Sequence, residues 1–333
     1  MKVAIFGAGE FGLALSDVLT YNNIKVSIYD KNIAKIDYIN KFHTLTRFNG
    51  IKINSQILVS NDLKKVISDS DFIVLAVPSN HIKEVLNLIL PFINKEVILI
   101  NAAKGFDIES KSTLIELIEK ITSDNHYIKG VGSILGPGFA IEIIKKNLTC
   151  VCAVSNSIDT ANKIQKIFSN DYFRVYTLTD TIGAQIGTSL KNAIAIASGI
   201  IIGLGYGENT KASLITRGLA EITRFGLFFG AKKETFLGLT GVGDLVLTCN
   251  SIESRNFQAG YIIGKHDDTS FFYKENKFTV EGINTIKVTY EISLLNNIDM
   301  PIIVGLYNCL FFNQKPSKII KELMIRPLKE EKW

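Results

Sequence analysis

A glycine-rich turn near the N-terminus constrains the fold more than any other part of the chain. A short apolar run, Val3–Phe6, leads directly into the letters GAGEFG, and an amphipathic segment, Phe11–Tyr21, follows. In a strand–turn–helix unit, Gly7 would permit the tight turn, Gly9 would let the backbone approach a pyrophosphate, and Gly12 would let helix and strand pack closely. The start of the helix favours anions. We therefore expect a dinucleotide at this turn.

The end of the second apolar run bears on which dinucleotide binds. Asp30 follows Val26–Tyr29, at about the spacing where such a motif places an acidic residue. A carboxylate there accepts a hydrogen bond from the ribose 2′-hydroxyl of NAD and repels the 2′-phosphate of NADP, whereas Lys31 would do the opposite. We expect both NADH and NADPH to be used. The glycine motif alone would also suit a flavin.

Short apolar runs alternate with amphipathic segments over the first half of the chain. The runs are apolar throughout, as expected for strands buried on both faces of a parallel sheet. Amphipathic segments such as Ser79–Leu90 and Lys111–Ile121 lie between them, which indicates βαβ units. We predict an α/β fold, with a Rossmann-type doubly wound parallel sheet over residues 1–180. The predicted strands are Val3–Phe6, Val26–Tyr29, Phe72–Val77, Val97–Ile100 and Thr149–Val154.

The second half has helical spacing, with glycines at the breaks between segments. We predict a mostly α-helical C-terminal domain over residues 181–333, and a surface loop over residues 267–279. The predicted helical segments are Ile182–Gly203, Thr210–Gly230, Asn284–Asn297 and Ser317–Ile325.

Composition narrows the class of protein. The chain has 333 residues, is 47% hydrophobic and 21% charged, and carries a net charge of +5. Its lysines are spread along the chain, so we expect no nucleic-acid partner. The four cysteines and four histidines show no metal-ligand spacing. The start lacks the features of a signal peptide, and Ala193–Gly205 is shorter than a membrane span. We expect a cytoplasmic protein without a metal.

A second group of candidate functional residues lies in the segment GLTGVGDLVLTCNSIESRN. This segment gathers Asp244, Thr248, Ser254, Arg255 and Asn256 in an apolar, glycine-rich frame. A guanidinium presents a rigid fork to a phosphate or carboxylate, and buried charges need a partner. The segment therefore predicts an anionic substrate. A structural Asp–Arg pair at a helix end is the alternative.

Two lysines could serve a reaction. Lys191 lies among small apolar residues of a predicted helix, where burial would lower its pKa and suit it to proton transfer. The alternative is a side chain that reaches solvent from the helix edge. Lys104 follows a predicted strand, at the edge where open α/β sheets bind ligands. Gly136 and Gly138 form a turn whose N–H groups could contact an anion.

The whole chain resembles bacterial NAD(P)H-dependent glycerol-3-phosphate dehydrogenases, which are soluble cytoplasmic enzymes that interconvert dihydroxyacetone phosphate and sn-glycerol 3-phosphate. The resemblance implies a homodimer that supplies glycerol 3-phosphate for glycerophospholipid synthesis, with no membrane insertion. The segments that resemble the family are GAGEFG, AAKGF, GPGFAIE, SLKN, GLGYGENTKASLITRGLAEITRFG, LTGVGDLVLTCNSIESRN, VEGINT and MPI.

The resemblance also implies roles for individual residues. Lys191 would donate and accept the proton, and Asp244 would keep the Lys191 side chain oriented. Arg255 would bind the substrate phosphate. Positions implied to contact the substrate are Lys104, Gly136, Gly138, Lys191, Asn192, Asp244, Thr248, Ser254, Arg255 and Asn256. The glycine turn and the second strand already predict cofactor contacts at Gly7, Gly9, Gly12 and Asp30. The resemblance adds cofactor contacts at Glu10, Phe11, Lys31, Lys104, Ala140, Arg255, Val280 and Glu281.

Three departures from the family pattern concern affinity and cofactor preference. Ala103 and Gly138 stand where the family usually has hydroxyl residues, and Tyr29-Asp30-Lys31 stands where it usually has Trp-small-Arg. Two rival functions share much of the pattern. One is another two-domain NAD(P)-dependent dehydrogenase, acting on hydroxy acids or ketopantoate. The other is a dinucleotide-sensing protein without turnover.

Overall fold

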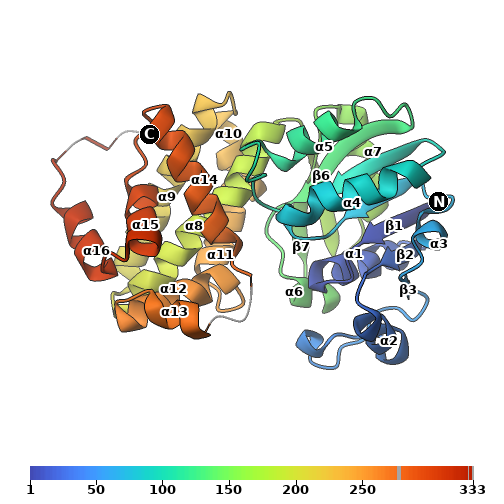
Figure 1. Ribbon diagram of the computed structural model, residues 1–333, viewed down its shortest axis with the longest axis horizontal. Coiled ribbons are helices and arrows are strands. Elements are labelled where there is room, and N and C mark those ends of the chain that lie inside the picture. The colour runs from blue at the N-terminus through green and yellow to red at the C-terminus, as the bar shows by residue number, and fades with distance from the viewer. Residues whose placement is uncertain (276–278, 329, 332–333) are drawn as a thin grey trace. The chain divides into compact units, whose positions relative to one another are not determined.

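The computed structural model describes residues 1–275, 279–328 and 330–331. It divides into two compact units, Met1–Thr181 and Ile182–Trp333 (Figure 1). The first unit is built on one sheet and the second is helical.

The first unit contains an eight-stranded sheet in the order β3-β2-β1-β4-β5-β6-β7-β8. Its strands are Lys2–Phe6 (β1), Lys25–Tyr29 (β2), Leu58–Ser60 (β3), Phe72–Leu75 (β4), Val97–Asn101 (β5), Ile128–Leu135 (β6), Thr149–Val154 (β7) and Phe173–Leu178 (β8). β1 pairs in parallel with both β2 and β4, so the strand order reverses at the carboxyl end of β1. This is the switch point at which doubly wound sheets bind nucleotides, and it confirms the predicted fold class.

Three strands and one strand direction differ from the sequence prediction. β7 runs antiparallel to β6, while β8 runs parallel to β7. β3, β6 and β8 were not predicted. β3 has only three residues, and glycines and the exposed Lys129 interrupt β6. β8 alternates buried Phe173 and Val175 with exposed Arg174 and Tyr176, as an edge strand does, so it contains no continuous apolar run.

Two groups of helices flank the sheet. α1 packs against α6 and α7, and α4 packs against α5 (Figure 1). The predicted helix at Lys111–Ile121 begins later, because the Thr113 side chain and Glu116 form a reciprocal cap at its start. The helices of this unit are Glu10–Tyr21 (α1), Ile33–Phe42 (α2), Leu63–Ile67 (α3), Ile82–Ile89 (α4), Leu114–Thr122 (α5), Ala140–Ile144 (α6) and Ile158–Phe168 (α7), with short 3₁₀ turns at Thr46–Phe48 (η1), Ser79–His81 (η2) and Leu90–Phe92 (η3).

The described residues of the second unit form helices joined by loops. Its elements are Thr181–Gly203 (α8), Glu208–Phe228 (α9), Lys233–Phe236 (α10), a π-helical turn Leu239–Gly243 (η4), Asp244–Cys249 (α11), Arg255–His266 (α12), Ser270–Glu275 (α13), Glu281–Leu295 (α14), Pro301–Phe312 (α15) and Pro316–Met324 (α16). Among the described residues, only α8 is long and apolar enough to cross a membrane. In this structure 89% of its most apolar window is buried, as in a core helix.

Glycines bring α8 and α12 into close contact. A Cβ added at Gly199 of α8 would lie 2.1 Å from the carbonyl oxygen of Phe257, and one added at Gly260 of α12 would lie 2.0 Å from that of Ile196. Any larger residue at either position would therefore push the helices apart. This contact fixes the start of α12 relative to α8.

The predicted loop at residues 267–279 is wrong over Ser270–Glu275, which forms α13. The Asp268 carboxylate accepts a hydrogen bond from the Ser270 N–H, and the Phe272 side chain is fully buried. A single buried aromatic ring among polar residues gave no clear periodicity, so the helix was missed. Residues 276–278 of this prediction lie outside the described residues.

Candidate active site and nucleotide turn

The glycine turn has the geometry that the sequence predicts. Gly7 adopts a φ of +111°, and a Cβ there would lie 2.5 Å from the Ala76 carbonyl oxygen. A Cβ at Gly12 would lie 2.1 Å from the carbonyl oxygen of Gly7, so α1 packs directly on the turn. A Cβ at Gly9 would instead point into open space, and no side chain caps α1. The residues therefore fit a pyrophosphate at the start of α1.

Asp30 lies buried at the carboxyl end of β2, bound to the glycine turn. Its Oδ2 accepts hydrogen bonds from the Ala8 N–H at 3.0 Å and from Lys35 Nζ at 2.6 Å. Its Oδ1 accepts one from the Asn32 N–H at 2.9 Å. Lys35, in the first turn of α2, was not singled out from the sequence. A lysine five residues after the acidic residue is the only sequence feature that could have suggested it.

The flanking cofactor positions are more exposed. Lys31 is exposed, with its Nζ 3.8 Å from the Glu84 carboxylate. Glu10, the first residue of α1, pairs with Arg47 at 3.0 Å. Phe11 packs against the buried core of the sheet. Lys31 and Glu10 are thus surface charges, whose ion pairs contribute little to stability.

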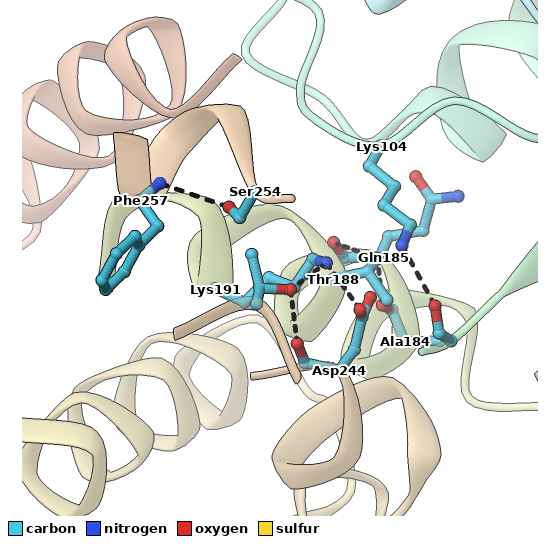
Figure 2. Close-up of polar contacts among 10 residues, drawn as sticks. Lys104, Ala184, Gln185, Thr188, Lys191, Asp244, Ser254 and Phe257 are labelled. Atoms are coloured by element: carbon cyan, nitrogen blue, oxygen red, sulfur yellow. Dashed lines mark hydrogen bonds and ion pairs between the residues drawn. The ribbon is translucent and has the colours of Figure 1, made fainter. Parts of the chain in front are cut away.

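Lys104 and Gly136 meet at the carboxyl edge of neighbouring parallel strands. Lys104 Nζ donates a hydrogen bond to the Gly136 carbonyl oxygen at 3.0 Å (Figure 2). Gly136 has a φ of +138°, and a Cβ there would lie 3.1 Å from Val151. Gly138 follows in the same turn, and the buried Ala140 begins α6.

Lys191 is buried in the second unit between a carboxylate and a hydroxyl. Its Nζ lies 2.5 Å from Asp244 Oδ1 and 2.6 Å from Thr248 Oγ1 (Figure 2). The Lys191 residue is 5% exposed and Asp244 is 0% exposed, which excludes a side chain that reaches solvent. Thr248 donates its own proton to the Asp244 carbonyl oxygen at 2.6 Å, so its hydroxyl oxygen faces the ammonium.

This arrangement requires the π-helical turn η4. It delivers Asp244 to the start of α11, and Thr248 follows one helical turn later, so both face Lys191 of α8. Gly187 and Gly241 allow the close approach: a Cβ at Gly187 would lie 2.5 Å from the Thr240 carbonyl oxygen, and one at Gly241 2.2 Å from that of Phe236. A buried ammonium with a paired carboxylate is an arrangement able to hold and transfer a proton.

The start of α12 gathers the polar residues that follow. Ser254 caps the helix by accepting a hydrogen bond from the Phe257 N–H at 3.2 Å. Asn256 Oδ1 accepts one from the Gly282 N–H at 2.9 Å, which joins α12 to the start of α14. Val280 is buried at the N-cap position of α14, where no side chain caps the helix, and Glu281 is the first residue of α14.

Arg255 stands apart from these contacts. It is exposed at the first position of α12. Over residues 1–275, 279–328 and 330–331 its guanidinium has no ion pair, whereas Asp244 pairs with Lys191. The alternative of a structural Asp–Arg pair is therefore excluded. Asn192, next to Lys191, is buried.

A cavity of about 980 Å³ lies elsewhere in the second unit. It is lined by α8, α9, α15, α16 and the segment after α16, and its described lining includes none of the predicted site residues. Size alone therefore does not locate the chemistry, which the buried Lys191–Asp244 pair marks instead.

A doubly wound sheet with a glycine turn at its switch point, followed by a helical unit with a buried lysine–carboxylate pair, defines a dinucleotide-dependent dehydrogenase. The family model for the N-terminus of NAD-dependent glycerol-3-phosphate dehydrogenase matches residues 2–161, and that for its C-terminus matches residues 180–321. The chain belongs to the NAD-dependent glycerol-3-phosphate dehydrogenase family.

Relatives match along the full length. A Staphylococcus epidermidis protein named glycerol-3-phosphate dehydrogenase [NAD(P)+] is 40% identical over 331 residues, 99% of each chain. A Bacillus velezensis protein of the same name is 41% identical, over 98% of this chain and 94% of the relative. The crystal structure of a Coxiella burnetii glycerol-3-phosphate dehydrogenase matches with a TM-score of 0.91 at 30% identity, covering 98% and 99% of the two chains.

A protein with one of the rival functions shares this fold. A Ralstonia eutropha ketopantoate reductase matches with a TM-score of 0.62 at 14% identity, over 96% of this chain and 100% of that one. At this identity the match shows a shared fold alone. The family models and the relatives at about 40% identity therefore favour a glycerol-3-phosphate dehydrogenase over a ketopantoate reductase.

Proposed function

We propose that the protein interconverts dihydroxyacetone phosphate and sn-glycerol 3-phosphate, using NADH or NADPH. The observation on which this rests most is the buried Lys191, held between Asp244 and Thr248. When bound, the nicotinamide supplies or accepts the hydride. Residues 1–180 bind the dinucleotide and residues 181–333 provide the proton chemistry.

Lys191 acts on the oxygen of the reacting carbon. In the reducing direction this oxygen gains negative charge, and the Lys191 ammonium stabilises that charge and donates a proton to it. Asp244 and Thr248 hold Nζ in place, since both oxygens lie within 2.6 Å of it. In the reverse direction the same lysine takes the proton from the hydroxyl.

Arg255 binds the substrate phosphate. Its exposed guanidinium is the cation without an ion pair at the start of α12 among the described residues, and a helix start adds favourable N–H dipoles. We assign the other substrate contacts to Lys104, Gly136, Gly138, Asn192, Asp244, Thr248, Ser254 and Asn256. We assign cofactor contacts to Gly7, Gly9, Glu10, Phe11, Gly12, Asp30, Lys31, Lys104, Ala140, Arg255, Val280 and Glu281.

The cellular role follows from the product. We propose a cytoplasmic homodimer that supplies glycerol 3-phosphate for glycerophospholipid synthesis, with no nucleic-acid partner and no inserted membrane segment. The family resemblance supports the dimer. The burial of α8 supports a helix that packs in the protein core.

The deciding experiment follows NADH oxidation by absorbance at 340 nm with a panel of ketones. Dihydroxyacetone phosphate should be reduced, while unphosphorylated dihydroxyacetone and ketopantoate should give almost no turnover. Comparable efficiency on the phosphorylated and unphosphorylated ketones would overturn the proposal. Binding of NADH without turnover on any ketone would favour the sensing protein instead.

A further inference from the structure

The side-chain amide of Asn101 holds the turn from which Lys104 extends. Asn101 is the last residue of β5 and is 0% exposed. Its Oδ1 accepts a hydrogen bond from the Ala103 N–H at 3.0 Å, and its Nδ2 donates one to the Ala103 carbonyl oxygen at 2.9 Å. One side chain therefore satisfies both backbone groups of the residue that directly precedes Lys104.

The same amide is also joined to the neighbouring strand. Its Nδ2 donates a further hydrogen bond to Ser133 Oγ at 3.3 Å, and Ser133 lies opposite Asn101 in the parallel register of β5 and β6. A primary amide has two donor protons, and the carbonyl oxygen and the hydroxyl use both of them. These contacts fix the amide in one orientation, because exchanging Oδ1 and Nδ2 would place an acceptor against a carbonyl and a donor against an N–H.

The residues between Asn101 and Lys104 contribute no polar side chain to this turn. Ala102 and Ala103 are both buried, and the Ala102 N–H donates to the Leu75 carbonyl oxygen of β4 at 2.9 Å. Buried backbone groups are costly to leave without a partner. The contact with β4 fixes the first peptide of the turn, and Asn101 fixes the next one.

The position of this turn decides where the Lys104 ammonium lies. Lys104 Nζ donates a hydrogen bond to the Gly136 carbonyl oxygen at 3.0 Å, in the turn that follows β6. A shift of the Ala103 peptide would move the lysine backbone away from that oxygen. Because Asn101 contacts Ala103 on one side and Ser133 of β6 on the other, it fixes both segments that the lysine side chain joins.

We infer that Asn101 is a positioning residue that acts on the reaction through Lys104. Its amide is fully buried and both of its donor protons bind the protein, so it acts by holding the lysine and not by touching the substrate. This inference rests on the proposed function, which assigns Lys104 to the substrate and cofactor contacts. A merely structural role would instead lower activity equally whether or not the lysine is present.

The test is a double-mutant cycle between Asn101→Ala and Lys104→Met, in which kcat, KM and thermal unfolding are measured for every variant. Asn101→Ala alone should lower kcat/KM for dihydroxyacetone phosphate about ten- to hundredfold, because a displacement of about 1 Å can cost about a hundredfold in rate. The loss should divide between kcat and KM as it does in Lys104→Met. In the Lys104→Met background the same change should lower kcat/KM less than about threefold.

Two further variants separate positioning from folding. Asn40→Ala is the matched control, because the Asn40 amide bonds both backbone groups of Val59 in the same way, with Nδ2 2.9 Å from the carbonyl oxygen and Oδ1 3.4 Å from the amide nitrogen. This control should change kcat/KM less than about threefold, since Asn40 has no contact with the Lys104 turn. Asn101→Asp enters the same cycle as Asn101→Ala, because it keeps the side-chain volume and the acceptor while removing both donors.

Equal losses in the wild-type and Lys104→Met backgrounds would overturn the inference, because Asn101 would then support the fold and not the lysine. An unchanged kcat/KM in either Asn101 variant would overturn it as well, and so would an equal loss in Asn40→Ala. Failure of the proposed function is distinguishable, since the wild-type protein would then not reduce dihydroxyacetone phosphate.

Discussion

Replacing Lys191 with methionine should abolish most turnover while leaving cofactor binding intact. Methionine retains much of the apolar stem but lacks the ammonium that lies 2.5 Å from Asp244. General acid catalysis contributes about 10²–10⁴-fold, which corresponds to about 2.7–5.4 kcal/mol of transition-state stabilisation. The loss should appear mainly in kcat, because proton donation stabilises the transition state more than the bound ketone. Some rise in KM is expected, since an ammonium also hydrogen-bonds the substrate.

Removing the Lys191 charge alone would also destabilise the folded protein. Asp244 is fully buried, so removing its partner leaves an uncompensated charge, and breaking a buried pair costs about 3–5 kcal/mol of stability. Lost turnover could then reflect lost folding. The double variant Lys191→Met/Asp244→Asn removes both charges and should recover much of that stability while remaining inactive.

The assay has three readouts for each variant: thermal unfolding, NADH binding by fluorescence, and kcat at saturating dihydroxyacetone phosphate. The reasoning is refuted if the folded double variant binds NADH and retains more than about a tenth of the wild-type kcat, a loss below the usual range for a general acid. Lys104 would then be the next candidate for the acid.

Three other predictions concern separate parts of the molecule. Arg255→Ala should raise KM for dihydroxyacetone phosphate by about ten- to hundredfold, the loss of one charge-assisted contact, and an unchanged KM would remove Arg255 from the phosphate site. Asp30→Asn should shift the kcat/KM ratio toward NADPH, because it removes the negative charge and leaves Lys35 unpaired; an unchanged ratio would show that Asp30 does not face the ribose. Burial raises the pKa of the Glu221 carboxyl to about 8, although the hydrogen bonds from the Ile302 and Ile303 N–H groups lower it. The carboxyl therefore binds a proton more tightly in the folded protein than in the unfolded chain. The free energy of unfolding should therefore fall as pH rises from about 4.5 to 8, and Glu221→Gln should flatten that dependence in urea titrations.

The parts of the fold that the sequence predicts are those governed by local chemistry. The glycine turn, β1 and α1 form one continuous segment, so spacing alone specifies them. β8 could not be found by the same search, because an edge strand alternates exposed and buried residues instead of forming an apolar run. The reversed direction of β7 depends on long-range pairing with β6, about which its own letters say nothing.

The site shows the same division. The letters around Lys191 left burial and exposure equally open, and the pairing with Asp244 was expected only from the family resemblance. The structure settles the burial because η4 and two close glycine contacts bring α11 against α8, and no local pattern encodes such a contact between distant segments. For Arg255 the letters indicate an apolar, glycine-rich frame, and only the structure shows that the residue is exposed at the start of α12.

Asp30 shows how a correct motif can still mislead about specificity. The motif identifies an acidic residue at the end of β2, and in this fold such a residue typically binds the ribose 2′-hydroxyl of NAD. The structure adds a second charge 2.6 Å away, from a residue that the motif does not include. The repulsion of a 2′-phosphate depends on the net charge at that point, and a paired ammonium weakens the negative charge of the carboxylate. The Asp30 carboxylate alone therefore does not predict the cofactor preference of this chain.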